Sequence, residues 1–230
     1  MSTLIRTASA AALVLAIAAC SRTASLAVEE LSAPESGGSA GDAGLAREPR
    51  TGALFLAWVA GDSGRRHVWF SRSTDAGTAW TAPVQVTRAP DDVGPPHGEA
   101  SPRVVAAGEG RVALVWSRSV PVPGRRFPAS LIRFARSFDG GATWSEPVTL
   151  NDDSTAAPGT HTFHGAVWLG DSGIAAAWLD ERGAADVPGH HHAPGDSAAP
   201  AAGDARIFMT TSPDFGTSWT PDRAAWGSVC

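Results

Sequence analysis

Residues 137–144 read Ser-Phe-Asp-Gly-Gly-Ala-Thr-Trp, and this octapeptide is one of three copies of the pattern Ser-x-Asp-x-Gly-x-x-Trp. The other copies lie at residues 73–80 and 212–219. Consecutive copies begin 64 residues (73 to 137) and 75 residues (137 to 212) apart, which is too long for one unit of a solenoid. Such spacing suits a four-stranded sheet with its loops. The three matches therefore indicate a repeated architectural unit.

The chemistry of the octapeptide explains its four fixed residues. An Asp carboxylate two positions after a Ser accepts hydrogen bonds from backbone N–H groups of its own tight turn. The Gly two positions later allows the positive φ that a hairpin turn needs, and the Trp covers the turn with apolar surface. We therefore expect structural roles for all twelve residues: Ser73, Asp75, Gly77, Trp80, Ser137, Asp139, Gly141, Trp144, Ser212, Asp214, Gly216 and Trp219.

Apolar runs flank each octapeptide in the same order and predict the strands of the repeat. One run ends in Trp, a second leads directly into the octapeptide, and a short one follows a Pro behind it. These runs lie at 54–58, 112–116 and 174–178, at 66–72, 131–136 and 207–211, and at 83–86, 147–150 and 221–224. Two repeats have a further run in front, at 103–106 and 163–168. The pattern predicts four antiparallel strands, a to d, with the octapeptide as the c–d turn.

The composition agrees with an all-β chain and excludes several function classes. Hydrophobic residues make up 43% of the 230 residues, which is too many for a disordered chain. The 25 Gly and 17 Pro argue against a helical bundle. The formal net charge is −5 and no basic cluster occurs, so we expect no nucleic-acid partner.

The N-terminal residues have the pattern of an export signal. Arg6 precedes an apolar, alanine-rich stretch over residues 8–19 that is too short to span a bilayer. This stretch ends in Ile17-Ala18-Ala19-Cys20, which resembles the lipobox of bacterial lipoproteins. The resemblance implies cleavage after residue 19, lipid on Cys20 and anchoring to the bacterial cell envelope through that lipid alone; an ordinary secretory signal is the alternative. Residues 20–48 are rich in Ser, Ala and Gly and predict a flexible tether, with the folded domain at 49–230.

The octapeptide in its strand context resembles the Asp box of the bacterial neuraminidase repeat, found in the sialidase superfamily. We therefore call residues 73–80, 137–144 and 212–219 Asp boxes 1, 2 and 3. The resemblance implies a sialidase-like β-propeller, which has six blades in the family, with about three four-stranded blades in this chain. It also implies that the chain is part of a longer propeller; a dimer of half-propellers is the alternative.

The strand order predicts which loops share a face. The a–b and c–d turns lie at one end of each blade, and the b–c and d–a loops lie at the other. In the sialidase family the active site lies away from the boxes, on this loop face. The candidate ligand-binding residues there are His97, Glu99, His161 and His164, and the candidate catalytic residues are Asp180, Glu181 and Arg182, with Arg118, Arg125 and Arg126 nearby.

The resemblance to sialidases implies an Arg cluster for the substrate carboxylate, an Asp acid/base and a Tyr nucleophile activated by Glu. This chain has no Tyr and no Arg-Ile-Pro opening. Two functions follow as expectations: an exo-α-sialidase in a longer protein, or a non-catalytic propeller that binds glycans or proteins at the cell surface. A purely structural lipoprotein is a third. We expect no cofactor and no metal site, since the adjacent His190, His191 and His192 cannot all face one ion. The sequence leaves the oligomeric state open.

Overall fold

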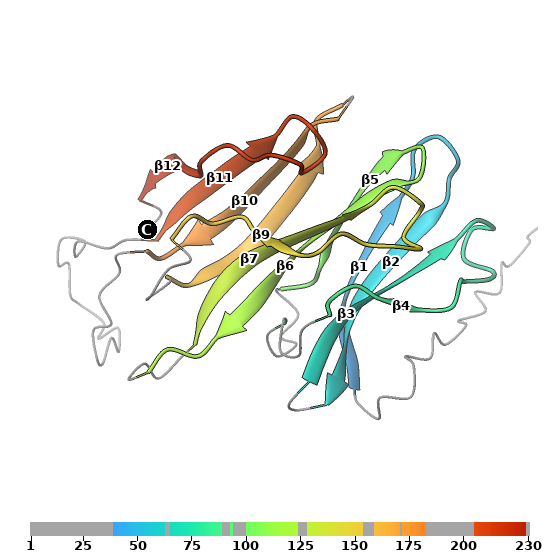
Figure 1. The fold of residues 1–230 in the computed structure, drawn as a ribbon, viewed down its shortest axis with the longest axis horizontal. Helices are drawn as coiled ribbons and strands as arrows, with labels where there is room; N and C mark the ends of the chain where they lie inside the picture. Colours follow the sequence, from blue (N-terminus) through green and yellow to red (C-terminus); the bar gives the residue numbers. More distant parts are fainter. Residues whose placement is uncertain are drawn as a thin grey trace, which may run out of the picture. The chain divides into compact units, whose positions relative to one another are not determined.

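Three four-stranded antiparallel sheets form the part of the chain that the computed structural model describes (Figure 1). The described residues are 39–62, 65–88, 93, 100–123, 128–153, 159–170, 172–182 and 205–228. Within these ranges every regular element is a strand, and no helix is long and apolar enough to cross a membrane. The predicted all-β fold of three four-stranded blades is thereby confirmed.

Each sheet is one blade, and its strands pair in sequence order. Blade 1 contains β1 (Ser39–Arg47), β2 (Leu54–Asp62), β3 (Arg65–Ser73) and β4 (Val84–Gln85). Blade 2 contains β5 (Arg103–Gly108), β6 (Arg111–Val120), β7 (Ala129–Ser137) and β8 (Val148–Thr149). Blade 3 contains β9 (His161–Trp168), β10 (Ile174–Asp180), β11 (Arg206–Ser212) and β12 (Arg223–Ser228).

The three Asp boxes form the same turn between the third and fourth strands of their blades. In box 2 the Ser137 hydroxyl donates to Asp139 Oδ1 at 2.7 Å and accepts the Gly141 N–H at 2.9 Å. Asp139 Oδ1 also accepts the Thr143 N–H at 2.9 Å, and the Trp144 indole donates to the Gly141 carbonyl at 3.0 Å. Boxes 1 and 3 repeat the Ser and Asp bonds within about 0.3 Å. The turn is therefore held by bonds among its own residues.

The boxes also pack the blades against one another. Phe70 of β3 meets Trp144 of box 2 edge-on, with ring centroids 5.1 Å apart. Phe134 of β7 meets Trp219 of box 3 in the same way at 4.9 Å. A Cβ added to Gly141 would lie 1.9 Å from the Phe70 ring, so the box Gly is required by packing as well as by its φ of 90°. One continuous apolar core joins blades 1 and 2, and a second joins blades 2 and 3.

Residues 39–47 form a strand, which corrects the expectation of a tether up to residue 48 and of a domain that starts at 49. β1 pairs with β2 on both sides of a register shift between Gly41 and Gly44, with Leu45 opposite Leu56. A Cβ at Gly44 would lie 1.9 Å from the carbonyl oxygen of Pro102, at the start of blade 2. This close approach requires Gly at position 44. The strand also lacks the bulky alternation by which a strand is recognised in a sequence.

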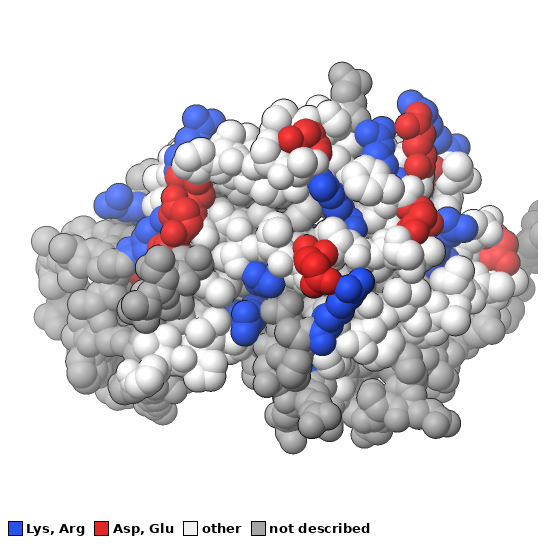
Figure 2. Space-filling model, viewed as in Figure 1, with Lys and Arg blue, Asp and Glu red and all other residues white. Residues whose placement is uncertain are grey.

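Charged side chains of both signs lie in small mixed groups on the face drawn in Figure 2. Exposed ion pairs, such as Arg88 with Glu146 at 2.6 Å and Arg50 with Glu109 at 3.1 Å, join neighbouring blades. Pairs of this kind contribute about 0–1 kcal/mol each. The stability of the described blades therefore rests on the two inter-blade cores.

Candidate functional site

A half-open cavity of about 180 Å³ lies at the strand ends opposite the Asp boxes. Blades 2 and 3 form most of its wall, and Asp42 of β1 adds a carboxylate. Five residues with hydroxyl side chains line it: Ser117, Ser119, Ser130, Thr160 and Thr162. Hydroxyl groups donate and accept hydrogen bonds, and their hydrogens rotate to suit a partner. The surface of the cavity is mainly apolar, and the Ser130 hydroxyl is already bonded within the protein, so the cavity is suited to a small ligand held by a few hydrogen bonds.

Behind this wall lies His161, the first residue of β9, whose side chain is fully buried. Its backbone N–H donates to the Ser130 hydroxyl at 2.6 Å, and that hydroxyl donates to the His161 carbonyl at 2.6 Å. The imidazole Nδ1 contacts the Ser130 carbonyl oxygen. These bonds tie β9 of blade 3 to β7 of blade 2 at the cavity, between the lining residues Thr160 and Thr162.

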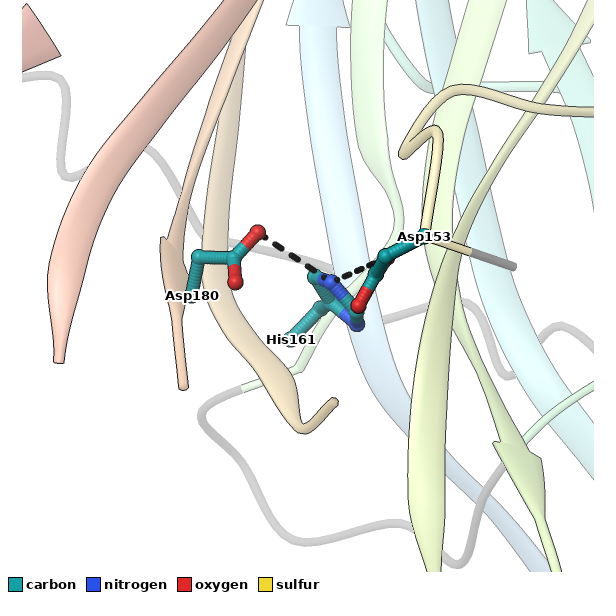
Figure 3. Close-up of side chains that lie close together, drawn as sticks. All are labelled: Asp153, His161 and Asp180. Carbon is teal, nitrogen blue, oxygen red and sulfur yellow. Dashed lines mark ion pairs between the residues drawn. The ribbon is translucent and has the colours of Figure 1, made fainter. Parts of the chain in front are cut away.

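The other ring nitrogen of His161 lies between two carboxylates (Figure 3). Nε2 is 3.0 Å from Asp153 Oδ1, in the loop before β9, and 3.2 Å from Asp180 Oδ2, at the end of β10. Neither contact has the alignment of a hydrogen bond, so both carboxylates share one Nε2 proton electrostatically. Burial opposes the imidazolium, but Asp153 and Asp180 outweigh it and raise the pKa of His161 to about 9.

Asp180 is buried and its oxygens already have partners. Oδ1 accepts the Arg182 backbone N–H at 2.8 Å and its Nε at 2.9 Å. Oδ2 accepts the Trp178 indole at 2.9 Å and Arg182 Nη2 at 2.7 Å. Burial opposes ionisation, but His161 and Arg182 outweigh it and hold the pKa of Asp180 far below its usual range. A carboxylate that stays ionised near neutral pH cannot donate a proton, so Asp180 is unsuited to be a general acid.

Arg182 bonds three carboxylates of the protein and lies 3.8 Å from a fourth, that of Asp153. Besides Asp180, its Nη1 bonds Asp152 at 2.6 Å and its Nη2 bonds Asp222 at 2.7 Å. The guanidinium carbon also lies 4.2 Å from the centre of the Phe208 ring. Arg182 thus joins blade 3 to the loop that leaves blade 2. Because these contacts engage its guanidinium, Arg182 is poorly placed to bind the carboxylate of a substrate.

Asp153, His161 and Asp180 also have the donor types of a metal site. One ligand atom from each lies within 4.8 Å of the others, and imidazole with carboxylate suits zinc. Both oxygens of Asp180, however, are bonded to Arg182, and a metal ion there would face that guanidinium at short range. The residues therefore fit a metal poorly. We interpret the cluster as an ion network that the second proton of His161 completes.

The structure brings three predicted site residues, His161, Asp180 and Arg182, into this cluster. Glu181 follows β10 with a partly exposed side chain, and its N–H donates to the Thr160 carbonyl at 3.0 Å. Arg118 lies within β6 and is partly exposed. His97, Glu99, Arg125, Arg126, His190–His192 and Cys20 lie outside the described residues.

His161 and His164, two of the candidate ligand-binding residues, have buried side chains. Their exposed fractions are 0% and 1%. The strand has a bulge, at which Phe163 takes a φ of 51° and the pairing with β10 shifts between Ala177 and Leu179. The extra residue places both imidazoles on the side that faces blade 2. Burial on that side removes both side chains from solvent.

Sequence reasoning missed Asp152, Asp153 and Asp222. The only local signal was the run Asn151-Asp152-Asp153 directly after β8, which reads as an ordinary polar turn. Asn151 bonds both Asp153 Oδ1 at 2.8 Å and the Ile132 N–H at 2.8 Å. The turn thereby carries Asp153 to His161. Its partner residues belong to another blade, so no local pattern identifies it.

Comparisons with known proteins support the fold. No family model matches the sequence, and a search of curated proteins gives no significant match. Among solved structures, the Hadza microbial sialidase Hz136 is similar with a TM-score of 0.50 and 18% identity, over 79% of this chain and 36% of that one. A protein of unknown function from Dyadobacter fermentans is similar with a TM-score of 0.54 and 13% identity, over 83% of this chain and 52% of that one.

The chain thus spans about a third to a half of the length of these structures. Their low sequence identity makes this a likeness of fold. The described residues form three consecutive blades of a sialidase-like β-propeller.

Proposed function

We propose that this chain is a glycan-binding, sialidase-like propeller of the bacterial cell envelope, which is exported and held at a membrane by lipid on Cys20. The observation that carries the proposal is the cavity on the loop face, with its five hydroxyl residues. Sugars present hydroxyl groups in fixed directions, and such ligands are recognised by a few placed polar groups within an otherwise apolar pocket. The volume of about 180 Å³ suits one sugar unit.

Binding is favoured over hydrolysis by the charged residues beside the cavity. Asp180 remains ionised, and Arg182 is engaged with carboxylates of the protein itself. The sequence also contains no Tyr to act as nucleophile. Cleavage of α-sialosides is therefore assigned to a longer propeller with further blades, and the described blades are assigned a recognition role. Export and lipid attachment rest on the resemblance of residues 17–20 to a lipobox.

A glycan array probed with the full chain, purified in detergent, tests this function. Ser119→Arg places a long charged side chain in the cavity and is expected to abolish binding. Ala142→Arg is the matched control, because Ala142 is exposed in box 2 at the opposite end of blade 2. If the array shows no glycan binding, or if Ser119→Arg binds as well as the control, the proposal is wrong.

A further inference from the structure

The contacts of the two ring nitrogens of His161 are both favourable only if the ring carries two protons. Nδ1 faces the carbonyl oxygen of Ser130, which can only accept, so Nδ1 must be protonated. In a neutral imidazole the other nitrogen then has a lone pair and no proton. That nitrogen would then lie, without a proton, 3.0 and 3.2 Å from carboxylate oxygens of Asp153 and Asp180. Three electron-rich groups would then meet in a buried space, which is strongly unfavourable.

The polar and charged groups around the ring come from the elements packed against it. β7 contributes the Ser130 carbonyl, the β8–β9 loop contributes Asp153, and β10 contributes Asp180. Trp178 of β10 also meets the ring edge-on at 6.4 Å. Arg182 Nη2 lies 2.7 Å from Asp180 Oδ2 and 3.8 Å from Asp153 Oδ1, so it neutralises part of the charge of both carboxylates. The imidazolium is the cation that lies within 3.2 Å of both.

The same residue holds the wall of the cavity. Ser130 lines the cavity and is bonded to His161 through its hydroxyl and its carbonyl. Thr160 and Thr162 line it on either side of His161. Loss of the Nε2 proton would push Asp153 and the β8–β9 loop away from the ring. The positions of these three hydroxyl residues therefore depend on the charge of a side chain that the ligand does not touch.

We propose that His161, as an imidazolium, is the positioning residue of the loop-face cavity, so that glycan binding requires its second proton. This inference rests on the proposed glycan-binding function. The pKa of about 9, against 6.5 for an ordinary His, supports it and defines the range: the ring stays charged through neutral pH and loses its proton around pH 9. Binding is expected to be constant from pH 6 to 8 and to fall at higher pH.

Long-range proton–nitrogen NMR of the imidazoles in the full chain tests the charge directly. We expect one histidine to keep both ring protons up to about pH 9, and the amide signals of Thr160 and Thr162 to shift with the same midpoint. Asp153→Asn removes one carboxylate and should move that midpoint to lower pH. Asp152→Asn is the control, because Asp152 contacts Arg182 rather than His161, and it should leave the midpoint in place. In His161→Gln the imidazole signal of residue 161 is absent, and this absence identifies the signal in the parent chain.

Titration with lactose, an uncharged disaccharide, at pH 7 and pH 10 tests the consequence for binding. We expect at least tenfold weaker binding at pH 10, and a loss that begins at lower pH in Asp153→Asn. Equal affinity at both pH values, a His161 that is neutral at pH 7, or wall amides that do not follow its titration would overturn the inference. It is also overturned if Zn²⁺ displaces the ring protons and raises the melting temperature. If lactose fails to bind at any pH and the array is also empty, the proposed function fails, while the NMR midpoints still decide whether His161 positions the wall.

Discussion

Replacing Gly141 with Ala tests how the blades are packed against each other. The same substitution at Gly77 is the matched control, because Gly77 has no aromatic ring of a preceding blade against it. The two residues occupy the same position of boxes 2 and 1, with φ values of 90° and 91°. The added Cβ at Gly141 would lie 1.9, 2.5 and 2.7 Å from three atoms of the Phe70 ring. At Gly77 the nearest atom, Leu54 Cδ1, is 3.6 Å away.

The expected cost follows from these distances. An L-residue at positive φ costs about 1–2 kcal/mol, and this cost is common to both variants. Phe70 cannot turn away from the new methyl group, since it is 1% exposed and packs against Phe55 and Trp144. Overpacking of this kind costs about 1–3 kcal/mol more. Gly141→Ala should therefore destabilise the protein by about 2–5 kcal/mol, and Gly77→Ala by about 1–2 kcal/mol.

Urea unfolding of the two variants and the parent chain measures the difference. We expect a lower midpoint for Gly141→Ala than for Gly77→Ala, with unchanged dependence on urea, which indicates a change in stability alone. Gly216→Ala should resemble Gly141→Ala, because its Cβ would lie 2.3 Å from the Phe134 ring. Equal losses for Gly141→Ala and Gly77→Ala would refute the idea that the box Gly is required by the preceding blade.

Three further predictions concern other parts of the chain. Asp139→Ala should lower the free energy of unfolding by about 1–3 kcal/mol, because donors of Ser137 and Thr143 lose their acceptor. Burial opposes the ionisation of Asp139, but these donors outweigh it and lower its pKa to about 2 from 3.8. The contribution of the ionised carboxylate to stability is therefore complete above about pH 4 and is lost as the pH falls to 2. Thermal melts of Asp139→Asn should accordingly show a weaker dependence of stability on acid pH than the parent chain. Mass spectrometry of membrane-extracted protein should find an acylated N-terminal Cys20, and an unmodified Cys20 within an intact soluble chain would contradict the lipobox. A fluorogenic α-sialoside should not be cleaved by the full 230-residue chain, and turnover that Asp180→Asn abolishes would overturn the structural role of Asp180.

The Asp boxes were predictable because their structure is local. Each box makes its defining hydrogen bonds within eight residues. In box 2 the turn is therefore determined almost entirely by four of its own residues: Ser137, Asp139, Gly141 and Trp144. The strands before each box alternate or run apolar over five or more residues, and this gave their order in each blade. The repeat of the three boxes, together with their resemblance to the Asp box of the sialidase superfamily, then indicated the fold class.

β1 was missed because tertiary contact determines its composition. At Gly44 the close contact with Pro102 leaves no room for a side chain, and a strand of mostly small residues resembles a linker in the sequence. The bulge at Phe163 had no recognisable pattern either, although it decides that His161 and His164 face blade 2. In both cases the neighbouring blade imposes the local structure.

The sequence by itself thus determined the repeat, the strand order and the end of each blade at which the loops gather, because hydrogen bonds and apolar periodicity act over a few residues. It also placed His161, Asp180 and Arg182 at that end. Only the tertiary structure decided that they form a buried ion network with Asp153, because His161 and Asp180 pair within blade 3, while Asp153 follows blade 2 and reaches them only after the blades have packed. Burial at that interface replaces water around the charges with fixed partners, and those partners set the protonation of His161.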